Sequence, residues 1–275
     1  YMEDEVVAII DPEKKGLTSN DVIQIGGDIP VVGSFNDTKK YKPDHLVIGN
    51  APQGGIVSEQ MLIEIKEAIT NGVNIVNGMH EFLSKNTYLK KLAEKSGSKI
   101  IDLRMPPNPP NFPKGSWRER KTPVLLVVGT DCDTGKMTTA WEIKTRLSAL
   151  NKKVKFIGTG QTGILLSDGV AIDAVISDFM SGEMENLIDT EVEDDTDLII
   201  VEGQGALSNY AYSGVTLGLI HGCMPDYFIL THDPSRSKDV MGHEIPDINE
   251  LMQLHIDLMA PFKSCLLYTS DAADE

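Results

Sequence analysis

The sequence has few cysteines and no long apolar run. Its three cysteines, Cys132, Cys223 and Cys265, are isolated and show neither disulfide nor metal-site spacing, so we expect a reducing, cytoplasmic environment. No apolar run approaches the length that spans a bilayer, and no basic, apolar leader opens the chain. We therefore expect no membrane partner and no signal peptide.

The chain also lacks an excess of positive charge. Its 41 Asp and Glu outnumber its 25 Lys and Arg, which gives a formal net charge of −16, and no Lys- or Arg-rich face offsets it. This balance argues against a nucleic-acid partner. The Gly-x-Gly-x-x-Gly fingerprint of dinucleotide-binding folds is absent, and so is any internal repeat. What remains is the composition of an ordinary globular protein, and 275 residues are enough for two domains.

The most informative stretch is VLLVVGTDCDTGKMTT, residues 124–139. An apolar run, a glycine-bounded turn and a helical pattern follow one another, which predicts a loop whose backbone N–H groups bind phosphate. The standard P-loop has four residues between its first glycine and the Gly-Lys pair, followed by Ser or Thr, whereas here five intervene and a methionine follows. The predicted phosphate- and cofactor-binding residues are Gly129, Thr130, Asp131, Cys132, Asp133, Thr134, Gly135, Lys136, Met137, Thr138 and Thr139.

Acidic residues near this loop raise the question of a metal ion. Glu202 follows the apolar run Leu198–Val201, which is typical of a strand covered on both faces, and ligands of open α/β sheets bind at that end of a strand. Glu202 is therefore the candidate Mg²⁺ ligand, with a solvated loop glutamate as the alternative. Asp131 and Asp133 either position the loop by accepting backbone N–H groups or hold Mg²⁺ through water.

Three residues are candidate catalytic groups because each follows a predicted strand at this same edge. His232 follows the strand predicted over 227–230 and can act as a general base. Asp178 follows the run 174–176 and can orient an amine, and Gln161 follows the strand that ends at residue 157 and can hydrogen-bond a substrate. A structural hydrogen bond, a helix cap and a plain turn are the respective alternatives.

Three further residues are candidate substrate contacts. Thr162 lies beside Gln161 in the turn TGQTG and offers a hydroxyl. The Arg236 guanidinium, in THDPSR, can pair bidentately with a carboxylate. His221, in the dipeptide HG, is the third candidate, and a structural hydrogen bond is the alternative role for this histidine.

The motifs together resemble known families. GTDCDTGK followed by VEGQG is similar to dethiobiotin synthetase and related P-loop enzymes of small molecules. VGTDCDTGKMTTAWEI, GTGQTGI, VEGQGALSNYAYSGVTLGLIHG and THDPSR more closely resemble the C-terminal domain of a family long described as a domain of unknown function and associated with D-glutamate N-acetyltransferase. GNAPQGG, GMHEFL and DLRMPP resemble the smaller domain that precedes it.

The resemblance implies an N-acetyltransferase that moves an acetyl group from acetyl-CoA to a small D-amino acid such as D-glutamate, and we expect a homo-oligomer. Acetyl-CoA contains a diphosphate, so the loop can hold it without nucleotide hydrolysis. The alternatives are an ATP- and Mg²⁺-dependent ligase or phosphoryl-transfer enzyme that acts on a small carboxylic acid, and a nucleotide-binding module without turnover.

A proline-rich connector divides the chain. Pro106–Trp117 has five prolines in twelve residues and cannot continue a helix or a central strand. Residues 1–110 should form a Rossmann-like α/β half-domain, and residues 120–264 a P-loop NTPase-like domain with a parallel sheet in three αβα layers. We expect strands over 6–10, 46–49, 73–76, 99–103, 124–128, 154–157, 174–176, 198–201 and 227–230, and helices over 58–71, 81–95, 136–150, 181–189 and 213–221.

Both ends of the sequence look unusual. The chain opens with Tyr1, so we expect a fragment. Its last eleven residues, CLLYTSDAADE over 265–275, resemble a translated sequencing adapter. We therefore expect the authentic sequence to stop near Ser264, and the non-native tail to find no place in the fold.

Overall fold

The computed structural model describes residues 5–49 and 55–268 of the chain. It divides into two compact units, Tyr1–Arg104 and Met105–Glu275, and each is built around its own apolar core. Most of the motif GNAPQGG, residues 50–54, lies outside the described residues, as do Tyr1 and residues 269–275.

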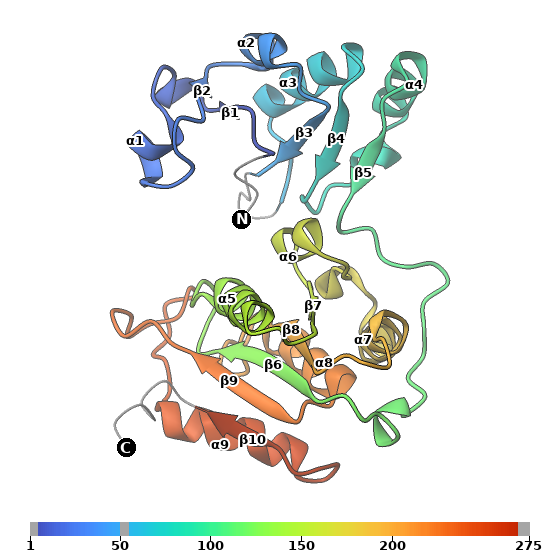
Figure 1. Ribbon diagram of the computed structural model, residues 1–275, viewed down its shortest axis with the longest axis vertical. Helices are drawn as coiled ribbons and strands as arrows, with labels where there is room; N and C mark the ends of the chain where they lie inside the picture. The colour runs from blue at the N-terminus through green and yellow to red at the C-terminus, as the bar shows by residue number, and fades with distance from the viewer. Residues whose placement is uncertain (1–4, 50–54, 269–275) are drawn as a thin grey trace. The chain divides into compact units, whose positions relative to one another are not determined.

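The first unit is a small parallel α/β domain. Strands β3 (His45–Ile48), β4 (Asn74–Asn77) and β5 (Ile100–Asp102) form a parallel sheet in that order, with α3 (Glu59–Thr70) and α4 (Thr87–Ser96) as the crossover helices (Figure 1). The Rossmann-like prediction is therefore confirmed. The strand expected over 6–10 is shorter, since β1 (Ile9–Ile10) pairs only with β2 (Val31–Val32). The remaining short elements are α1 (Ser19–Ile23), α2 (Phe35–Thr38) and the 3₁₀ turns Pro12–Lys14 and Lys39–Tyr41.

The helix expected over 81–95 begins later than predicted. Leu83–Lys85 forms a separate 3₁₀ turn, and α4 begins only at Thr87. The reason is local, because the Asn86 side chain accepts hydrogen bonds from the backbone N–H groups of Tyr88 and Leu89 and so caps the helix there.

The second unit has the predicted three αβα layers. Its parallel strands lie in the order β10-β9-β6-β8-β7, with bounds Val124–Gly129 (β6), Val154–Ile157 (β7), Leu198–Glu202 (β8), Tyr227–Thr231 (β9) and Leu266–Tyr268 (β10). Alternate residues of β6 enter two different cores, Val124, Leu126 and Val128 on one face and Leu125 and Val127 on the other. Helix α5 (Lys136–Ala149) covers the second of these faces, and α7 (Ser177–Glu191), α8 (Ser213–Cys223) and α9 (Ile248–Met259) cover the first (Figure 1).

The strand predicted over 174–176 is wrong. Ile172–Ala174 forms a 3₁₀ turn, and α7 begins at Ser177. The preceding backbone is bonded to the end of β7, since Val170 N–H donates to Gly158 and Ile172 N–H to Thr159. Ile172 and Val175 are buried whereas Ile176 is exposed, and a short apolar run does not by itself distinguish a strand from other structure.

The prediction that the tail has no place in the fold is wrong for residues 265–268. Leu266–Tyr268 forms β10, which pairs in parallel with β9, and Cys265 and Leu267 pack against the main core. Three apolar residues beside an open strand edge suffice for this pairing. The adapter origin of the tail stays a prediction.

The proline-rich connector belongs to the second unit and is bonded to α7 by two buried glutamates. Glu183 accepts the Asn111 backbone N–H at 2.5 Å and its side-chain amide at 2.9 Å. Glu185 accepts the backbone N–H groups of Lys114 and, at 2.6 Å, of Ser116. These carboxylates supply partners for N–H groups that an extended connector cannot bond to itself.

These bonds predict a pH-dependent stability. Burial raises the pKa of Glu185, but the hydrogen bonds outweigh it and leave that pKa below its ordinary value. The stabilisation is therefore complete above the pKa of an unfolded glutamate, about 4.3, and is lost as the pH falls below it. We expect Glu185→Gln to lower the free energy of unfolding by about 1–3 kcal/mol at pH 7, and by less near pH 4.

Urea unfolding followed by tryptophan fluorescence measures this effect, because Trp117 and Trp141 are the only tryptophans of the sequence and both lie in the second unit. The exposed Glu142 of α5 supplies a control, and Glu142→Gln should change little at either pH. A difference between wild type and Glu185→Gln that is the same at both pH values would contradict the prediction.

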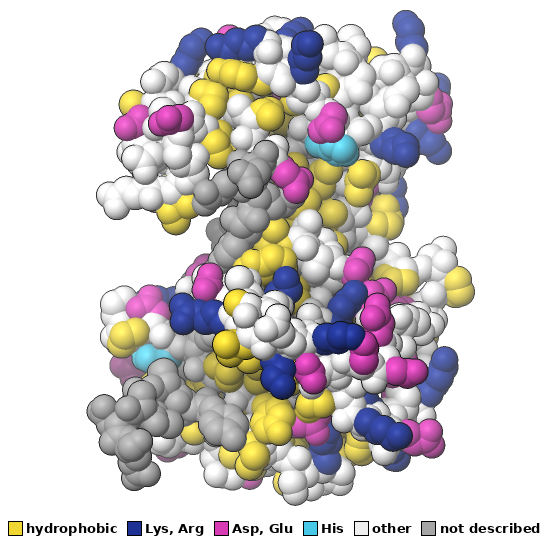
Figure 2. All heavy atoms as spheres, viewed as in Figure 1, with side chains coloured by type: hydrophobic (Ala, Val, Ile, Leu, Met, Phe, Trp, Pro, Cys, Tyr) yellow, Lys and Arg dark blue, Asp and Glu magenta, His cyan; other side chains and the backbone are white. Residues whose placement is uncertain are grey.

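Charged side chains of both signs mix on one face of the second unit. On the face shown in Figure 2, its acidic and basic side chains are interspersed. Within the described ranges, no helix has the length and apolar character needed to cross a membrane.

Candidate functional site

The carboxyl ends of four parallel strands meet at one edge of the second unit's sheet. The register places Gly129 of β6 beside Thr231 of β9, Val127 beside Glu202 of β8, and Ile157 of β7 beside Val201. Each strand continues into a segment that carries predicted site residues. This edge is where ligands of open α/β sheets bind.

The predicted phosphate loop is tightly curled. Gly129 has no room for a side chain, since a Cβ there would lie 2.4 Å from Thr134 Oγ1. Asp133 and Gly135 adopt left-handed conformations with φ of 56° and 85°, and α5 begins directly afterwards at Lys136. When left-handed residues alternate with right-handed ones in this way, successive N–H groups turn toward one side and form an anion-binding concavity. Thr134 Oγ1 lies 2.9 Å from Thr231 Oγ1 and joins the loop to β9.

The Lys136 side chain folds back over this loop. Its ammonium donates to the Asp131 carbonyl at 2.6 Å, and only 8% of the residue is exposed. Burial lowers the pKa of Lys136, and an anion bound in the loop would stabilise the charged form of this lysine. Met137 and Thr139 are half-buried at the start of α5, and Thr138 is exposed.

Asp131 connects the loop to two distant segments. Its buried carboxylate accepts Asn209 Nδ2 at 2.9 Å and the Val240 N–H at 2.7 Å, and pairs with Arg236. Arg236 also donates to the Cys132 carbonyl at 2.8 Å. Burial raises the pKa of Asp131, but its hydrogen bonds and the Arg236 charge outweigh this and hold that pKa below its ordinary value. In the structure Asp131 thus has the contacts expected of an acid that positions the loop.

Arg236 is a candidate partner for a substrate carboxylate. In the structure its guanidinium is bound to a carboxylate of the chain itself, and its substrate role stays a prediction. Sequence spacing cannot reveal this pairing, because 105 residues separate the two partners.

Glu202 is buried rather than solvated. Its Oε2 accepts the N–H groups of Thr159 at 2.9 Å and Gly160 at 3.2 Å, and its Oε1 lies 3.4 Å from the Gln204 side-chain amide. The carboxylate therefore holds the β7–α6 turn, before α6 (Gln161–Leu166) begins. Within the part of the chain that the structure describes, no group of three or more His, Cys, Asp or Glu could hold a metal ion. The Mg²⁺ role of Glu202 stays a prediction.

Three other predicted residues lie at this edge. His232 follows β9, is half-buried, and places Nδ1 3.1 Å from Thr130 Oγ1. Gln161 is the half-buried first residue of α6, and Thr162 beside it is exposed. The structure thus brings the phosphate loop, Glu202, Gln161, Thr162 and His232 to one edge of the sheet.

Two predicted residues do not belong to this arrangement. His221 lies in the last turn of α8 and packs against Phe262 with ring centroids 5.4 Å apart. The adjacent Lys263 pairs with Asp226 before β9, so His221 lies at the opposite edge of the sheet from the phosphate loop, and its substrate role stays a prediction. The physical reason is that a helix after a parallel strand returns across the sheet, by about 1.5 Å per residue. Asp178 follows no strand and is an exposed residue in the first turn of α7.

Sequence reasoning missed Asn209 and Thr159 as partners of the two buried acids. Asn209 is buried and bonds Asp131, and Thr159 Oγ1 donates to the Glu202 carbonyl at 2.7 Å. The one available signal was a small polar residue beside each glycine-rich motif, which is too common to single out a partner.

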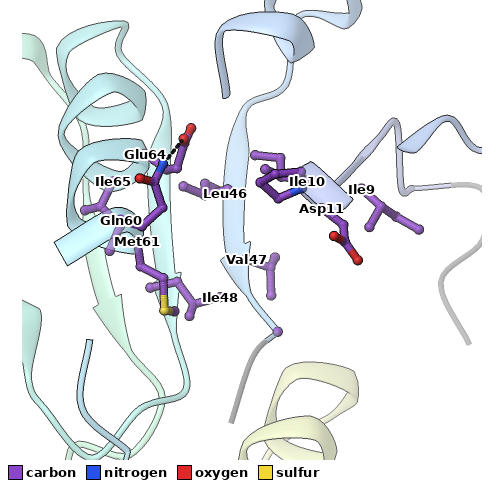
Figure 3. Close-up of a pocket in the computed structure, with 12 residues that line it drawn as sticks. Ile9, Ile10, Asp11, Leu46, Val47, Ile48, Gln60, Met61, Glu64 and Ile65 are labelled. Atoms are coloured by element: carbon purple, nitrogen blue, oxygen red, sulfur yellow. Dashed lines mark hydrogen bonds between the residues drawn. The ribbon is translucent and has the colours of Figure 1, made fainter. Parts of the chain in front are cut away.

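A separate cavity of about 460 Å³ lies within the first unit. Figure 3 shows Glu64, bonded to Gln60, on its α3 side and Asp11 on its β1 side. None of the predicted site residues lines it, and its two carboxylates oppose a phosphate ligand. Its apolar walls are Ile9, Ile10, Leu46, Val47, Ile48 and Met61.

Comparisons with known proteins agree with this architecture. Residues 12–106 match the family model described as a domain of unknown function (DUF1611_N), Rossmann-like domain, and residues 111–270 match the DUF1611_C P-loop domain. A crystal structure of a DUF1611 family protein from Anabaena variabilis has a TM-score of 0.89 and 32% identity, over 98% of this chain and 80% of that one.

Two curated relatives are similar over most of the chain. A D-glutamate N-acetyltransferase from Pseudoalteromonas sp. is 41% identical over 226 residues, which are 81% of this chain and 67% of the relative. A D-glutamate N-acetyltransferase from Tritonibacter scottomollicae is 39% identical over 228 residues, with 82% and 67% covered. The chain therefore belongs to the DUF1611 family, with a Rossmann-like domain followed by a P-loop domain.

Proposed function

We propose that this chain transfers the acetyl group of acetyl-CoA to the amino group of a small amino acid such as D-glutamate. The relatives named D-glutamate N-acetyltransferase support the reaction. The observation that favours acetyl-CoA over ATP as the cofactor is the residue composition of the phosphate loop and its surroundings. Met137 stands where nucleotide-hydrolysing P-loops present a hydroxyl to Mg²⁺, and Glu202 is already bonded to backbone N–H groups. A loop of this kind suits a diphosphate that is bound but not cleaved.

In the proposed reaction the substrate nitrogen attacks the thioester carbonyl, a C–N bond forms, and the C–S bond breaks. The amine must be neutral to attack, and His232 is our candidate for the base. If its Nδ1–H donates to Thr130 Oγ1, its Nε2 keeps the lone pair that accepts the amine proton, and that proton then passes to the departing thiolate. Backbone N–H groups or the Gln161 amide are our candidates for stabilising the tetrahedral oxyanion.

The second candidate is ATP- and Mg²⁺-dependent chemistry on a small carboxylic acid. It is favoured by the electrostatic interaction of Glu202 with Lys136, whose charged form the carboxylate stabilises. Thr138, exposed in the first turn of α5, would then supply the hydroxyl for the metal.

A thiol-release assay distinguishes the two candidates. We expect free CoA thiol to appear when D-glutamate is added to enzyme and acetyl-CoA, and we expect the rate to be unchanged by EDTA. Assays with L-glutamate and without amino acid are the controls. The proposal is overturned if acetyl-CoA releases no thiol while Mg-ATP yields ADP in the presence of substrate.

Two further properties belong to this proposal. We place the enzyme in the cytoplasm, in line with the three cysteines, which are free thiols in the structure. We also propose a homo-oligomer, which light scattering of the purified chain would test.

A further inference from the structure

The two segments that bind Asp131 also carry exposed aromatic and apolar side chains. Asn209 is followed by Tyr210, and Val240 belongs to a short hairpin over residues 237–245. In that hairpin Ile245 N–H donates to the Ser237 carbonyl at 3.0 Å and Asp239 N–H to the His243 carbonyl at 2.7 Å. Both segments are thereby held beside the phosphate loop by the same carboxylate.

Tyr210 and His243 bring these segments into contact. Their ring centroids lie 5.3 Å apart with the rings nearly perpendicular, at 77°. Tyr210 is 68% exposed, so most of its ring remains open to solvent. Val240 and Met241, which belong to the same hairpin as His243, are also exposed. The result is an open aromatic and apolar surface, tied to the phosphate loop through Asn209 and Val240.

We propose that Tyr210 and His243 form the surface on which the adenine ring of acetyl-CoA stacks. This inference rests on the proposed function, because it assigns the base of the molecule whose diphosphate the loop would hold. Three observations support it. Tyr210 directly follows Asn209 and His243 lies three residues after Val240, so both rings are anchored close to hydrogen-bond partners of Asp131. The surface presents an aromatic ring, and adenine carries no charge for the acidic chain to repel. Base–aromatic stacking needs no more than an accessible ring face.

Matched probes separate the adenine contact from the phosphate contact. CoA carries both adenine and diphosphate, whereas 4′-phosphopantetheine carries a phosphate and the same arm without adenine. We expect Tyr210→Ala to weaken CoA about tenfold in isothermal titration, and to leave 4′-phosphopantetheine unchanged. Tyr210→Phe keeps the ring and should bind CoA like the wild type. ADP should lose affinity with Tyr210→Ala as CoA does, because it shares the base.

The controls distinguish this inference from the proposed function. Tyr88→Ala removes a tyrosine that is 59% exposed on α4 of the first unit, and should change nothing. If Lys136→Ala weakens CoA while Tyr210→Ala does not, the stacking surface is overturned and the phosphate loop stands. If Tyr210→Ala weakens 4′-phosphopantetheine as much as CoA, the residue acts through the loop and the inference also fails. If neither variant changes CoA binding, the phosphate loop assignment fails as well.

Discussion

Lys136→Ala should weaken acetyl-CoA binding by roughly 1.5–3 kcal/mol, the contribution of a hydrogen bond to a charged group. In the structure the Lys136 ammonium donates to the Asp131 carbonyl of the loop. Exchanging this carbonyl for a phosphate replaces a neutral acceptor by an anionic one. Isothermal titration calorimetry of acetyl-CoA measures the difference.

The fold should survive this change, because a buried ammonium is costly to desolvate and its removal relieves that cost. Lys152→Ala is the matched control, since Lys152 is an exposed lysine in the loop after α5 and should leave affinity unaltered. Unchanged affinity in the Lys136→Ala protein would refute phosphate binding by this loop.

Asp131→Asn should lower the free energy of unfolding by about 3 kcal/mol, the low end for breaking a buried ion pair. The change removes the charge that pairs with Arg236 and weakens the acceptor shared by Asn209 and Val240. We place the effect at the low end because the Arg236 side chain is 23% exposed and keeps some contact with water. Urea unfolding followed by fluorescence of Trp117 and Trp141 reports on the unit that contains this network.

A second aspartate in the same loop provides the comparison. Asp133 is exposed and adopts φ of 56°, a conformation that asparagine tolerates, so Asp133→Asn should stay within about 0.5 kcal/mol of wild type. Equal stability of the two variants would show that Asp131 does not hold the loop.

Features encoded within a few residues were predictable. The run from Val124 to Val128 is buried on both faces as a central strand must be, and the glycines and lysine after it fall where α5 begins. The position of Glu202 at the end of β8 follows from the same pattern. Short-range periodicity and turn chemistry are sufficient for such elements.

Features that depend on distant partners were not predictable. Asp131 reaches Asn209, Arg236 and Val240, which lie 78, 105 and 109 residues further along the chain. Nothing in the local pattern around Arg236 says that its guanidinium turns to this carboxylate. The distance of His221 from the loop was unpredictable for a related reason, because a position in a glycine-rich motif does not tell which end of a helix lies at the ligand edge.

The long-range anchoring of Asp131 has a consequence for how the protein is made. Asp131 is added to the growing chain 109 residues before Val240, which donates one of the hydrogen bonds that hold it. At about 5–20 residues per second, roughly 5–20 s separate the two events. A nascent chain therefore contains the whole phosphate-binding motif before it contains Arg236 and Val240, which fix the loop through Asp131. We expect the capacity to bind ligand to arise only when the C-terminal third of the second unit has been synthesised.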